Sequence, residues 1–279
     1  MILEGKKYAA LLKDEARKMA EELGITPGLA VIIVGSDPAS CVYVRNKEKA
    51  CQELGFYSEL IELPETTSKD ELLEVIERLN NEPKVHGILV QLPLPKALAP
   101  FEHEILDSIS PVKDVDGFHP INVGNLSIGR EALVPCTPYG CIKMLELENI
   151  AIEGKHAVII GRSNIVGKPL AQLLLAKNAT VTVCHSRTTN LAEITRQADI
   201  LIAAVGKPHF VTKDMVKPGA VVLDVGINRI APKKLVGDVD FENVKDIASY
   251  ITPVPGGIGL LTIAMLMQNT VRAAKLQLS

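Results

Sequence analysis

The sequence is poor in aromatic residues, with no tryptophan among its 279 positions, and it contains no block of lysine and arginine. Proteins that bind nucleic acid generally use a basic surface, often with aromatic side chains among the cationic ones. The formal net charge of -3 at pH 7 points the other way. The sequence therefore predicts no nucleic-acid partner.

Long apolar runs are absent as well. The longest runs, such as residues 29–34 and 157–160, have the length of buried strands, whereas a membrane-spanning helix needs about 20 apolar residues. The first residues do not follow the basic, then apolar, then small order of a secretory signal. We therefore expect no membrane association and a cytoplasmic location.

The cysteines show no paired spacing. Their number, five, is odd and no Cys-x-x-Cys pair occurs, which favours reduced thiols in the core over a disulfide framework. The six histidines also lack the His-x-x-x-His spacing or any comparable pattern of metal ligands. No metal site is therefore expected.

What the sequence does contain is a regular alternation of helical and strand-like segments. Its 279 residues, 47% of them hydrophobic, are enough for two domains with substantial cores. The predicted strands are residues 29–34, 57–63, 85–91, 156–160, 180–184, 200–205 and 221–225. The predicted helices are residues 7–23, 38–54, 69–80, 138–147, 169–176 and 260–276. Strands separated by helices predict an α/β fold with mainly parallel sheets, covered on both faces.

One predicted helix, residues 38–54, carries a lysine on its apolar side. Asp37 suits the N-cap, Pro38 the first turn and Gly55 the C-terminal end. Helical spacing places Lys47 on one stripe with Ser40, Tyr43, Val44, Cys51 and Leu54. Loss of hydration on that side would lower the pKa of the amine and prepare it for proton transfer. Alternatively, the side chain lies along the apolar surface and carries its ammonium to water.

The end of the strand 85–91 and the chain beyond it also indicate function. Gln91 closes this strand at its carboxyl end, where parallel sheets bind their ligands. It is therefore expected either to face Lys47 and a ligand, or simply to cap the strand. Prolines, glycines and asparagines then accumulate between residues 93 and 137, which we interpret as a long irregular connection with a binding function.

A turn that contains glycines, residues 161–169, joins a predicted strand to a predicted helix. Glycines let the backbone approach a phosphate closely, and a helix N-terminus supplies free N–H groups and a positive dipole end. This arrangement is typical of dinucleotide binding, although the spacing differs from Gly-x-Gly-x-x-Gly. An ordinary tight turn between strand and helix is the alternative.

The end of the following strand indicates which dinucleotide is bound. NAD sites usually have an acidic residue there for the ribose hydroxyls, whereas this chain has His185, Ser186 and Arg187. A carboxylate would repel a 2′-phosphate, while Arg162, Ser186 and Arg187 can hold one by charge-assisted hydrogen bonds. The sequence therefore predicts NADP rather than NAD, unless the arginines are solvated surface charges.

Eight stretches of this chain, in order, resemble the bifunctional methylenetetrahydrofolate dehydrogenase/cyclohydrolase family. They are residues 38–40 with 43–47, 87–95, 113–118, 135–138, 161–169, 217–220, 224–228 and 252–259. The resemblance covers nearly the whole chain. It implies an α/β catalytic domain, residues 1–137 completed by the helix 260–279, and a Rossmann-like NADP-binding domain, residues 138–259, with a cleft between them.

The resemblance implies an enzyme of one-carbon metabolism and purine biosynthesis that catalyses two successive reactions. Hydride passes from the one-carbon bridge of 5,10-methylenetetrahydrofolate to NADP, giving 5,10-methenyltetrahydrofolate. Water then attacks the cationic carbon, and ring opening gives 10-formyltetrahydrofolate. A homodimer formed through the cofactor domain is also implied.

The resemblance also implies residue roles. Lys47 is the family's catalytic lysine, and Gln91 would hold its amine. Tyr43 would stack on the aminobenzoyl ring, Asp116 would pair with N–H groups of the pterin, and Ser40 would assist in polar contacts around Lys47. The implied folate-binding residues are Ser40, Tyr43, Gln91, Leu92, Asp116, Pro255, Gly256 and Gly257. The implied cofactor-binding residues are Gly161, Arg162, Ser163, Ile165, Val166, Gly167, His185, Ser186, Arg187, Gly226 and Ile227.

Two positions depart from these roles. Asp114 resembles Asp116 in type but has no evident task, and we expect it to cap a loop. Leu260 stands where the family commonly has proline, which leaves the start of the last helix open. Two other functions remain as alternatives: a dehydrogenase without cyclohydrolase activity, and a noncatalytic protein that binds folate or nucleotide.

Overall fold

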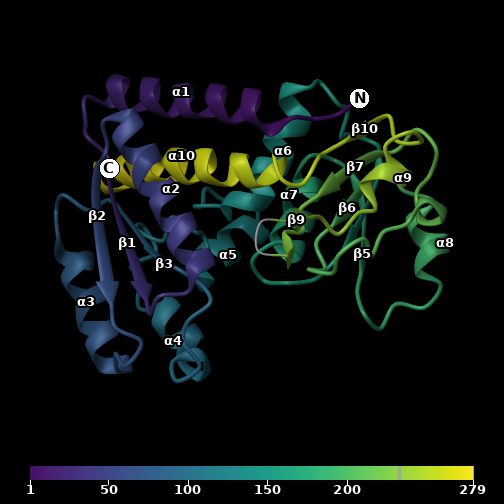
Figure 1. The fold of residues 1–279 in the computed structure, drawn as a ribbon. Coiled ribbons are helices and arrows are strands. Elements are labelled where there is room, and N and C mark those ends of the chain that lie inside the picture. The colour runs from purple at the N-terminus through teal and green to yellow at the C-terminus, as the bar shows by residue number, and fades with distance from the viewer. Residues whose placement is uncertain (232–233, 279) are drawn as a thin grey trace. The chain divides into compact units, whose positions relative to one another are not determined.

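The structure is a computed structural model that describes residues 1–231 and 234–278, and the chain forms two compact units (Figure 1). The first unit comprises Leu11–Cys136 and Ile263–Ser279, and the second comprises Met1–Ala10 and Thr137–Thr262. Both contain a parallel sheet, so the predicted α/β class is confirmed. The predicted domain boundaries stay a prediction. By its contacts, Met1–Ala10 groups with the second unit, and Ser279 lies outside the described residues.

The first unit contains a three-stranded parallel sheet with the order β2–β1–β3. Its strands are β1 (Gly28–Val34), β2 (Tyr57–Leu63) and β3 (Gly87–Val90). Its helices include α2 (Pro38–Leu54) and α3 (Lys69–Asn81), while α1 (Gly5–Leu23) and α10 (Ile258–Leu278) each have residues that belong to both units. The central strand, β1, is buried along its whole length. Its carboxyl end lies beside that of β3, since Ile32 pairs with Val90.

Helix α2 begins and ends at the predicted residues. Oδ2 of Asp37 accepts hydrogen bonds from the backbone N–H (2.8 Å) and the hydroxyl (2.9 Å) of Ser40. Gly55 ends the helix in the left-handed conformation, with φ 71°, which glycine adopts without steric strain. Lys47 therefore projects from the same stripe as the buried residues Val44, Cys51 and Leu54.

The connection from residue 93 to residue 137 is less irregular than predicted. It contains a 3₁₀ turn, η1 (Ala99–Phe101), and the helices α4 (Glu102–Asp107) and α5 (Pro120–Ser127). Proline occupies the first positions of η1 and α5, and the Nδ1 atom of His119 accepts the N–H of Ile121 at the start of α5. Two of the prolines that suggested irregular chain, Pro100 and Pro120, thus lie in first turns of helices, where proline has no N–H to lose.

The second unit contains a five-stranded parallel sheet with the order β10–β7–β6–β4–β5. Its strands are β4 (His156–Ile160), β5 (Thr180–Cys184), β6 (Ile200–Ala203), β7 (Val221–Asp224) and β10 (Tyr250–Ile251). A two-stranded antiparallel pair, β8 (Asn228–Ala231) and β9 (Lys234–Val236), follows β7. The helical segments are α6 (Cys136–Leu147), α7 (Gly167–Ala176), α8 (Leu191–Thr195), η2 (Lys213–Met215) and α9 (Phe241–Val244).

Some predicted boundaries shift by a few residues. Helix α7 begins at Gly167 rather than at residue 169, and α10 begins at Ile258 rather than at residue 260, so that Leu260 lies in its first turn. β3 is shorter than predicted at both ends, and β6 and β7 end one or two residues earlier than predicted. Within residues 1–231 and 234–278, no helix has the length and apolar character needed to cross a membrane.

Candidate active site

Lys47 and Gln91 meet above the carboxyl end of the first unit's sheet. The Nζ atom of Lys47 donates to Oε1 of Gln91 at 2.9 Å. Gln91 directly follows β3, and its backbone N–H donates to the carbonyl of Ile32 on β1 at 2.8 Å. Its Nε2 atom donates to the carbonyl of Leu92 at 2.7 Å. The amide oxygen of Gln91 is therefore the atom that faces the lysine.

The amine of Lys47 is placed where its charged form is disfavoured. Burial lowers the pKa of Lys47, while the charges of Asp116 and Cys136 oppose that shift. A neutral amine still has N–H bonds to donate to Gln91, and it gains a lone pair that can accept a proton. The pair can therefore hold an amine in a fixed orientation and use it as a base.

Asp116 lies in a short loop that hydrogen bonds of the preceding residues, Lys113 and Asp114, hold in place. Before it, the buried Nζ atom of Lys113 donates to the carbonyls of Leu79 and Glu82, both at 3.0 Å. Asp114 accepts the backbone N–H of His119 at 2.8 Å and the side-chain amide of Asn122 at 3.0 Å. This is the loop-capping role expected of Asp114.

The carboxyl group of Asp116 itself is electrostatically coupled to Lys47. Burial raises the pKa of Asp116 to about 6, the positive charge of Lys47 opposes that increase, and Asp114 adds to it. The charged form of Asp116 is therefore disfavoured by burial and favoured while Lys47 carries its positive charge. A carboxylate can accept two N–H bonds from one flat ligand edge.

Gly117 lets two segments of backbone approach each other behind Asp116. Its φ is +69°, and a Cβ atom added there would lie 2.6 Å from the carbonyl oxygen of Leu133 and 2.8 Å from the backbone nitrogen of Pro135. A side chain at this position meets both an unfavourable conformation and rigid backbone.

Replacing Gly117 with alanine is expected to lower the free energy of unfolding by roughly 2–5 kcal/mol, from backbone strain and overpacking together. Urea denaturation followed by circular dichroism measures this change. Gly124→Ala is the matched control, because Gly124 lies in α5 with nothing within 4 Å of an added Cβ. Equal midpoints for the two variants would contradict the role of Gly117.

The other predicted folate-binding residues of the first unit are placed as follows. Tyr43 lies on α2 one turn before Lys47, with 38% of its surface exposed. Ser40 is buried, but its hydroxyl donates to Asp37 and no hydrogen bond joins it to Lys47 among the described interactions. Leu92 provides the carbonyl that orients Gln91. The assistance of Ser40 at the lysine therefore stays a prediction.

Pro255, Gly256 and Gly257 belong to the second unit. The carbonyl of Gly256 accepts the N–H of Gly5 at 2.7 Å. A Cβ atom on Gly257 would lie 2.5 Å from the carbonyl oxygen of Pro253, and one on Gly5 would lie 2.1 Å from the carbonyl oxygen of Gly257. This close packing of backbone explains the glycines and connects the N-terminal segment to the start of α10.

In the second unit, the predicted dinucleotide turn joins β4 to α7. A Cβ atom on Gly161 would lie 2.2 Å from the carbonyl oxygen of Ala204, and one on Gly167 would lie 2.1 Å from the carbonyl oxygen of Gly161. The hydroxyl of Ser163 accepts the N–H groups of Val166 (3.2 Å) and Gly167 (3.4 Å) at the start of α7. Both glycines are thus required to close the turn. The remaining residues predicted to bind the cofactor from this turn are Arg162 and Ile165, which are exposed.

The chain after β5 forms a tight turn beside this one. The N–H of Arg187 donates to Nδ1 of His185 at 3.1 Å, and the N–H of His185 donates to the hydroxyl of Thr188 at 2.9 Å. β4 and β5 are parallel neighbours, and the N–H of Gly161 donates to the carbonyl of Cys184 at 2.9 Å. The predicted positions on both strands therefore share one end of the sheet, where Ser186 and Arg187 are exposed.

Two buried carboxylates that the sequence did not single out fix the neighbouring loops. Asp238 accepts the N–H groups of residues 205–207 at 2.6–2.9 Å and the side-chain amide of Asn228 at 2.9 Å. Asp224 accepts the N–H of Gly226 at 3.0 Å and those of Asp238 and Val239. Burial, together with the charge of Asp238, raises the pKa of Asp224 to about 7, although its backbone hydrogen bonds oppose the increase. Gly226 and the exposed Ile227 are held by this network.

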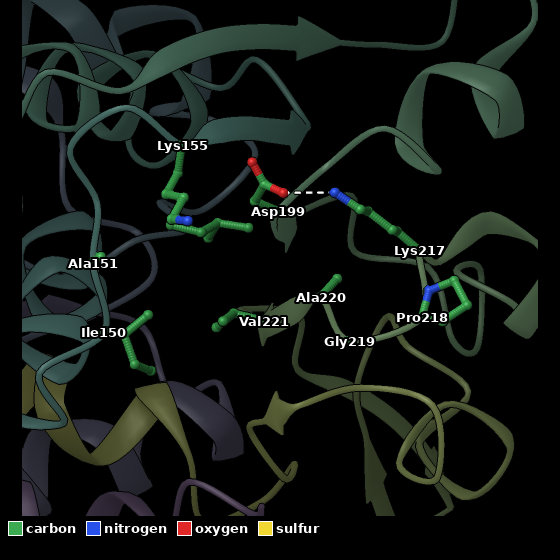
Figure 2. A pocket seen from close by; sticks show the side chains of 10 residues that line it. Ile150, Ala151, Lys155, Asp199, Lys217, Pro218, Gly219, Ala220 and Val221 are labelled. Carbon is green, nitrogen blue, oxygen red and sulfur yellow. Dashed lines mark hydrogen bonds and ion pairs between the residues drawn. The ribbon is translucent and has the colours of Figure 1, made fainter.

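A cavity of about 210 Å³ lies at the opposite end of the same sheet (Figure 2). Lys155, Asp199 and residues 217–221 line it, and Lys217 pairs with Asp199 at 2.7 Å. These residues precede or begin β4, β6 and β7, so the cavity is at the amino ends of the strands. Ligands of parallel sheets bind at the carboxyl ends, and we therefore assign this cavity no part in cofactor binding. In the part of the chain that the structure describes, no three His, Cys, Asp or Glu side chains cluster as metal ligands.

Comparison with known proteins agrees with this geometry. The tetrahydrofolate dehydrogenase/cyclohydrolase catalytic domain matches residues 3–116, and the NAD(P)-binding domain of the same family matches residues 135–278. The bifunctional protein FolD of Halalkalibacterium halodurans is 59% identical over 99% of each chain.

Two solved structures are similar over the same length. The bifunctional FolD methylenetetrahydrofolate dehydrogenase/cyclohydrolase of Campylobacter jejuni is 52% identical, with a TM-score of 0.95 over 99% of each chain. The Trypanosoma brucei enzyme, solved with NADP cofactor and inhibitor, is 38% identical, with a TM-score of 0.93 over 100% of this chain and 98% of that one. The chain therefore belongs to the tetrahydrofolate dehydrogenase/cyclohydrolase family.

Proposed function

We propose that the protein is a bifunctional enzyme of folate one-carbon metabolism. It oxidises 5,10-methylenetetrahydrofolate to 5,10-methenyltetrahydrofolate with NADP, and it hydrolyses the product to 10-formyltetrahydrofolate. The observation that carries this proposal is the hydrogen bond of 2.9 Å between Lys47 and Gln91, with Asp116 electrostatically coupled to the same amine. The family membership of both halves of the chain supports it.

For hydrolysis, the chemistry needs a base that does not repel its substrate. The methenyl group is cationic, so a neutral amine near it avoids the repulsion that an ammonium would produce. Burial favours the neutral form of Lys47, and the hydrogen bond to Gln91 directs the amine. Lys47 then takes the proton of the attacking water.

Asp116 and Tyr43 bind the folate in this proposal. The carboxylate of Asp116 accepts the paired N–H groups of the pterin. The partly exposed ring of Tyr43, one helical turn from Lys47, stacks on the aminobenzoyl ring. Gln91, Leu92 and Ser40 complete the contacts of the first unit.

For the oxidation, the second unit holds NADP at the carboxyl ends of β4, β5 and β7. The close-packed turn at Gly161 and Gly167 presents the N-terminus of α7 to the phosphates. Arg162, Ser186 and Arg187 would hold the 2′-phosphate. A bound NADP would supply the acceptor for the hydride of the one-carbon bridge. The chain's contribution to this step is positioning, which by itself accelerates reactions strongly.

An assay with purified protein and methylenetetrahydrofolate, run with NADP and with NAD, tests both reactions. Reduction of NADP and decay of methenyltetrahydrofolate faster than its spontaneous rate are expected. Decay at only the spontaneous rate would leave a monofunctional dehydrogenase. Failure to reduce either cofactor would favour a noncatalytic binding protein.

We also propose that the protein is a homodimer formed through its second unit. β5 is an edge strand of the five-stranded sheet, and it exposes Val183, with Leu175 exposed on the preceding helix. An exposed strand edge with apolar side chains is suited to pairing with a second copy. Light scattering after gel filtration should give twice the chain mass of 30.1 kDa, and Val183→Lys should shift it toward the monomer. A monomeric wild-type protein would contradict the proposal.

The product and the cysteines suggest the cellular setting. 10-Formyltetrahydrofolate is a one-carbon donor for purine biosynthesis, and we assign the protein to that supply. The five cysteines are all free thiols, as expected in a reducing compartment such as the cytoplasm.

A further inference from the structure

Asn269 connects the last helix to the two backbone segments that carry the acidic and thiol groups near Lys47. It lies on α10, fully buried. Its Nδ2 atom donates to the carbonyls of Val115 and Val134, both at 2.8 Å. Val115 precedes Asp116, and Val134 lies two residues before Cys136. One amide group thus joins two loops that are separate in sequence.

The oxygen of the same amide has no partner. Oδ1 of Asn269 is buried and accepts no hydrogen bond from any residue that the structure describes. A buried acceptor without a partner destabilises the folded protein, and an apolar side chain of similar size would avoid that loss. The Nδ2 atom also donates weakly to the sulfur of Cys136, at 3.6 Å. An asparagine at this position is therefore explained by the hydrogen bonds that it donates, not by helix packing.

The two loops that Asn269 joins are in close contact at Gly117, the residue after Asp116. Gly117 is pressed against the backbone of residues 133–135, where an added Cβ atom would meet atoms 2.6–2.8 Å away. The thiol of Cys136 donates to the carbonyl of Val115 at 3.5 Å. This carbonyl therefore accepts hydrogen bonds from both Cys136 and Asn269. The peptide just before Asp116 is thereby fixed from two directions.

We propose that Asn269 is a positioning residue of the folate site, which sets the place of Asp116 relative to Lys47 by holding the carbonyls of Val115 and Val134. This inference rests on the proposed function, since it assigns Asp116 to the binding of folate. Asn269 does not touch the substrate. It acts by fixing the backbone of the two loops at Val115 and Val134.

Gln268, the neighbouring residue on α10, provides a matched control. It is also buried, with 2% of its surface exposed, and its Nε2 atom donates to the carbonyl of Leu12 at 3.1 Å and to Glu15 at 3.0 Å. Its amide therefore connects α10 to α1 in the same way, but not to the loops around Asp116. Loss of this amide is expected to weaken the fold without changing the site.

The test compares Asn269→Leu with Gln268→Leu in cyclohydrolase and dehydrogenase assays, together with thermal unfolding of each variant. Asn269→Leu is expected to raise KM for the folate substrate by about 10-fold to 100-fold, as misplacement of a binding group by about 1 Å does. KM for NADP should stay within about twofold, because the loops of the second unit keep their own hydrogen bonds. Gln268→Leu should lower Tm and leave both KM values unchanged.

A folded Asn269→Leu protein with the wild-type KM for folate would overturn the inference, and so would an equal rise in KM in Gln268→Leu. If Asn269→Leu does not fold, the test uses Asn269→Ser instead, which keeps one donor in a smaller side chain. The inference again requires a rise in KM for the folate substrate. An inactive wild-type enzyme would instead refute the proposed function, so that the two failures are distinguishable.

Discussion

Replacing Lys47 with methionine is expected to slow hydrolysis of methenyltetrahydrofolate by about 10²–10⁴-fold, the usual contribution of a positioned acid or base. Methionine keeps most of the apolar length of the side chain but has no lone pair basic enough to accept a proton from water. Folate should still bind, since Asp116 and Tyr43 are unchanged. Hydride transfer should fall less than hydrolysis, because it depends mainly on positioning.

The matched control for this variant is Lys49→Met. Lys49 lies on the same helix but is exposed, with its ammonium 4.0 Å from Glu53. The same substitution there removes a positive charge without touching the pair of Lys47 and Gln91. Stopped-flow absorbance of methenyltetrahydrofolate, corrected for spontaneous decay, measures both variants. Hydrolysis at the wild-type rate in Lys47→Met would remove Lys47 from the mechanism.

Replacing Arg187 with aspartate is expected to change the preference for NADP over NAD by about 100-fold. A charge-assisted hydrogen bond contributes about 1.5–3 kcal/mol, which is lost with the guanidinium. The new carboxylate would repel the 2′-phosphate of NADP and accept hydrogen bonds from the ribose hydroxyls of NAD. The ratio of kcat/KM for the two cofactors is the quantity to measure.

Lys155→Asp provides the same change of charge at the other end of the same sheet. Lys155 precedes β4 and lines the cavity at the amino ends of the strands (Figure 2). The overall charge of the two variants is therefore equal, and a general effect of charge on a polyanionic cofactor would appear in both. An unchanged ratio in Arg187→Asp would mean that other residues hold the 2′-phosphate.

Much of this fold could be predicted from the sequence because its signals are local. Asp37, Pro38 and Gly55 fix the ends of α2 within the helix itself, and the predicted bounds were correct. The strands 156–160 and 180–184 were also correct, since each is a short segment rich in β-branched residues that follows a glycine or asparagine turn. The connection from 93 to 137 was predicted less well. A proline there indicates either a break or a helix start, and the sequence pattern alone does not separate the two.

The candidate site also has one part that could be predicted from the sequence and one part that could not. The side chains expected to perform chemistry, such as Lys47, Gln91 and Asp116, could be found from their type, their spacing and their resemblance to a family. Their roles remain predictions, although the structure joins Lys47 to Gln91 directly. Two other residues gave no such signal: Asn269, which bonds to the segments around Asp116, and Asp238, which fixes loops of the second unit.

Local sequence patterns are sufficient to predict the alternation of helices and strands and the ends of the best-capped helices, because each of these depends on residues within a few positions of one another. The groups that support the site become visible only in the folded chain. Asn269 bonds to carbonyls 135 and 154 residues away, and Asp238 to N–H groups more than 30 residues away. Backbone N–H and carbonyl groups are the same in every residue except proline, so these partners become identifiable only when folding brings them together.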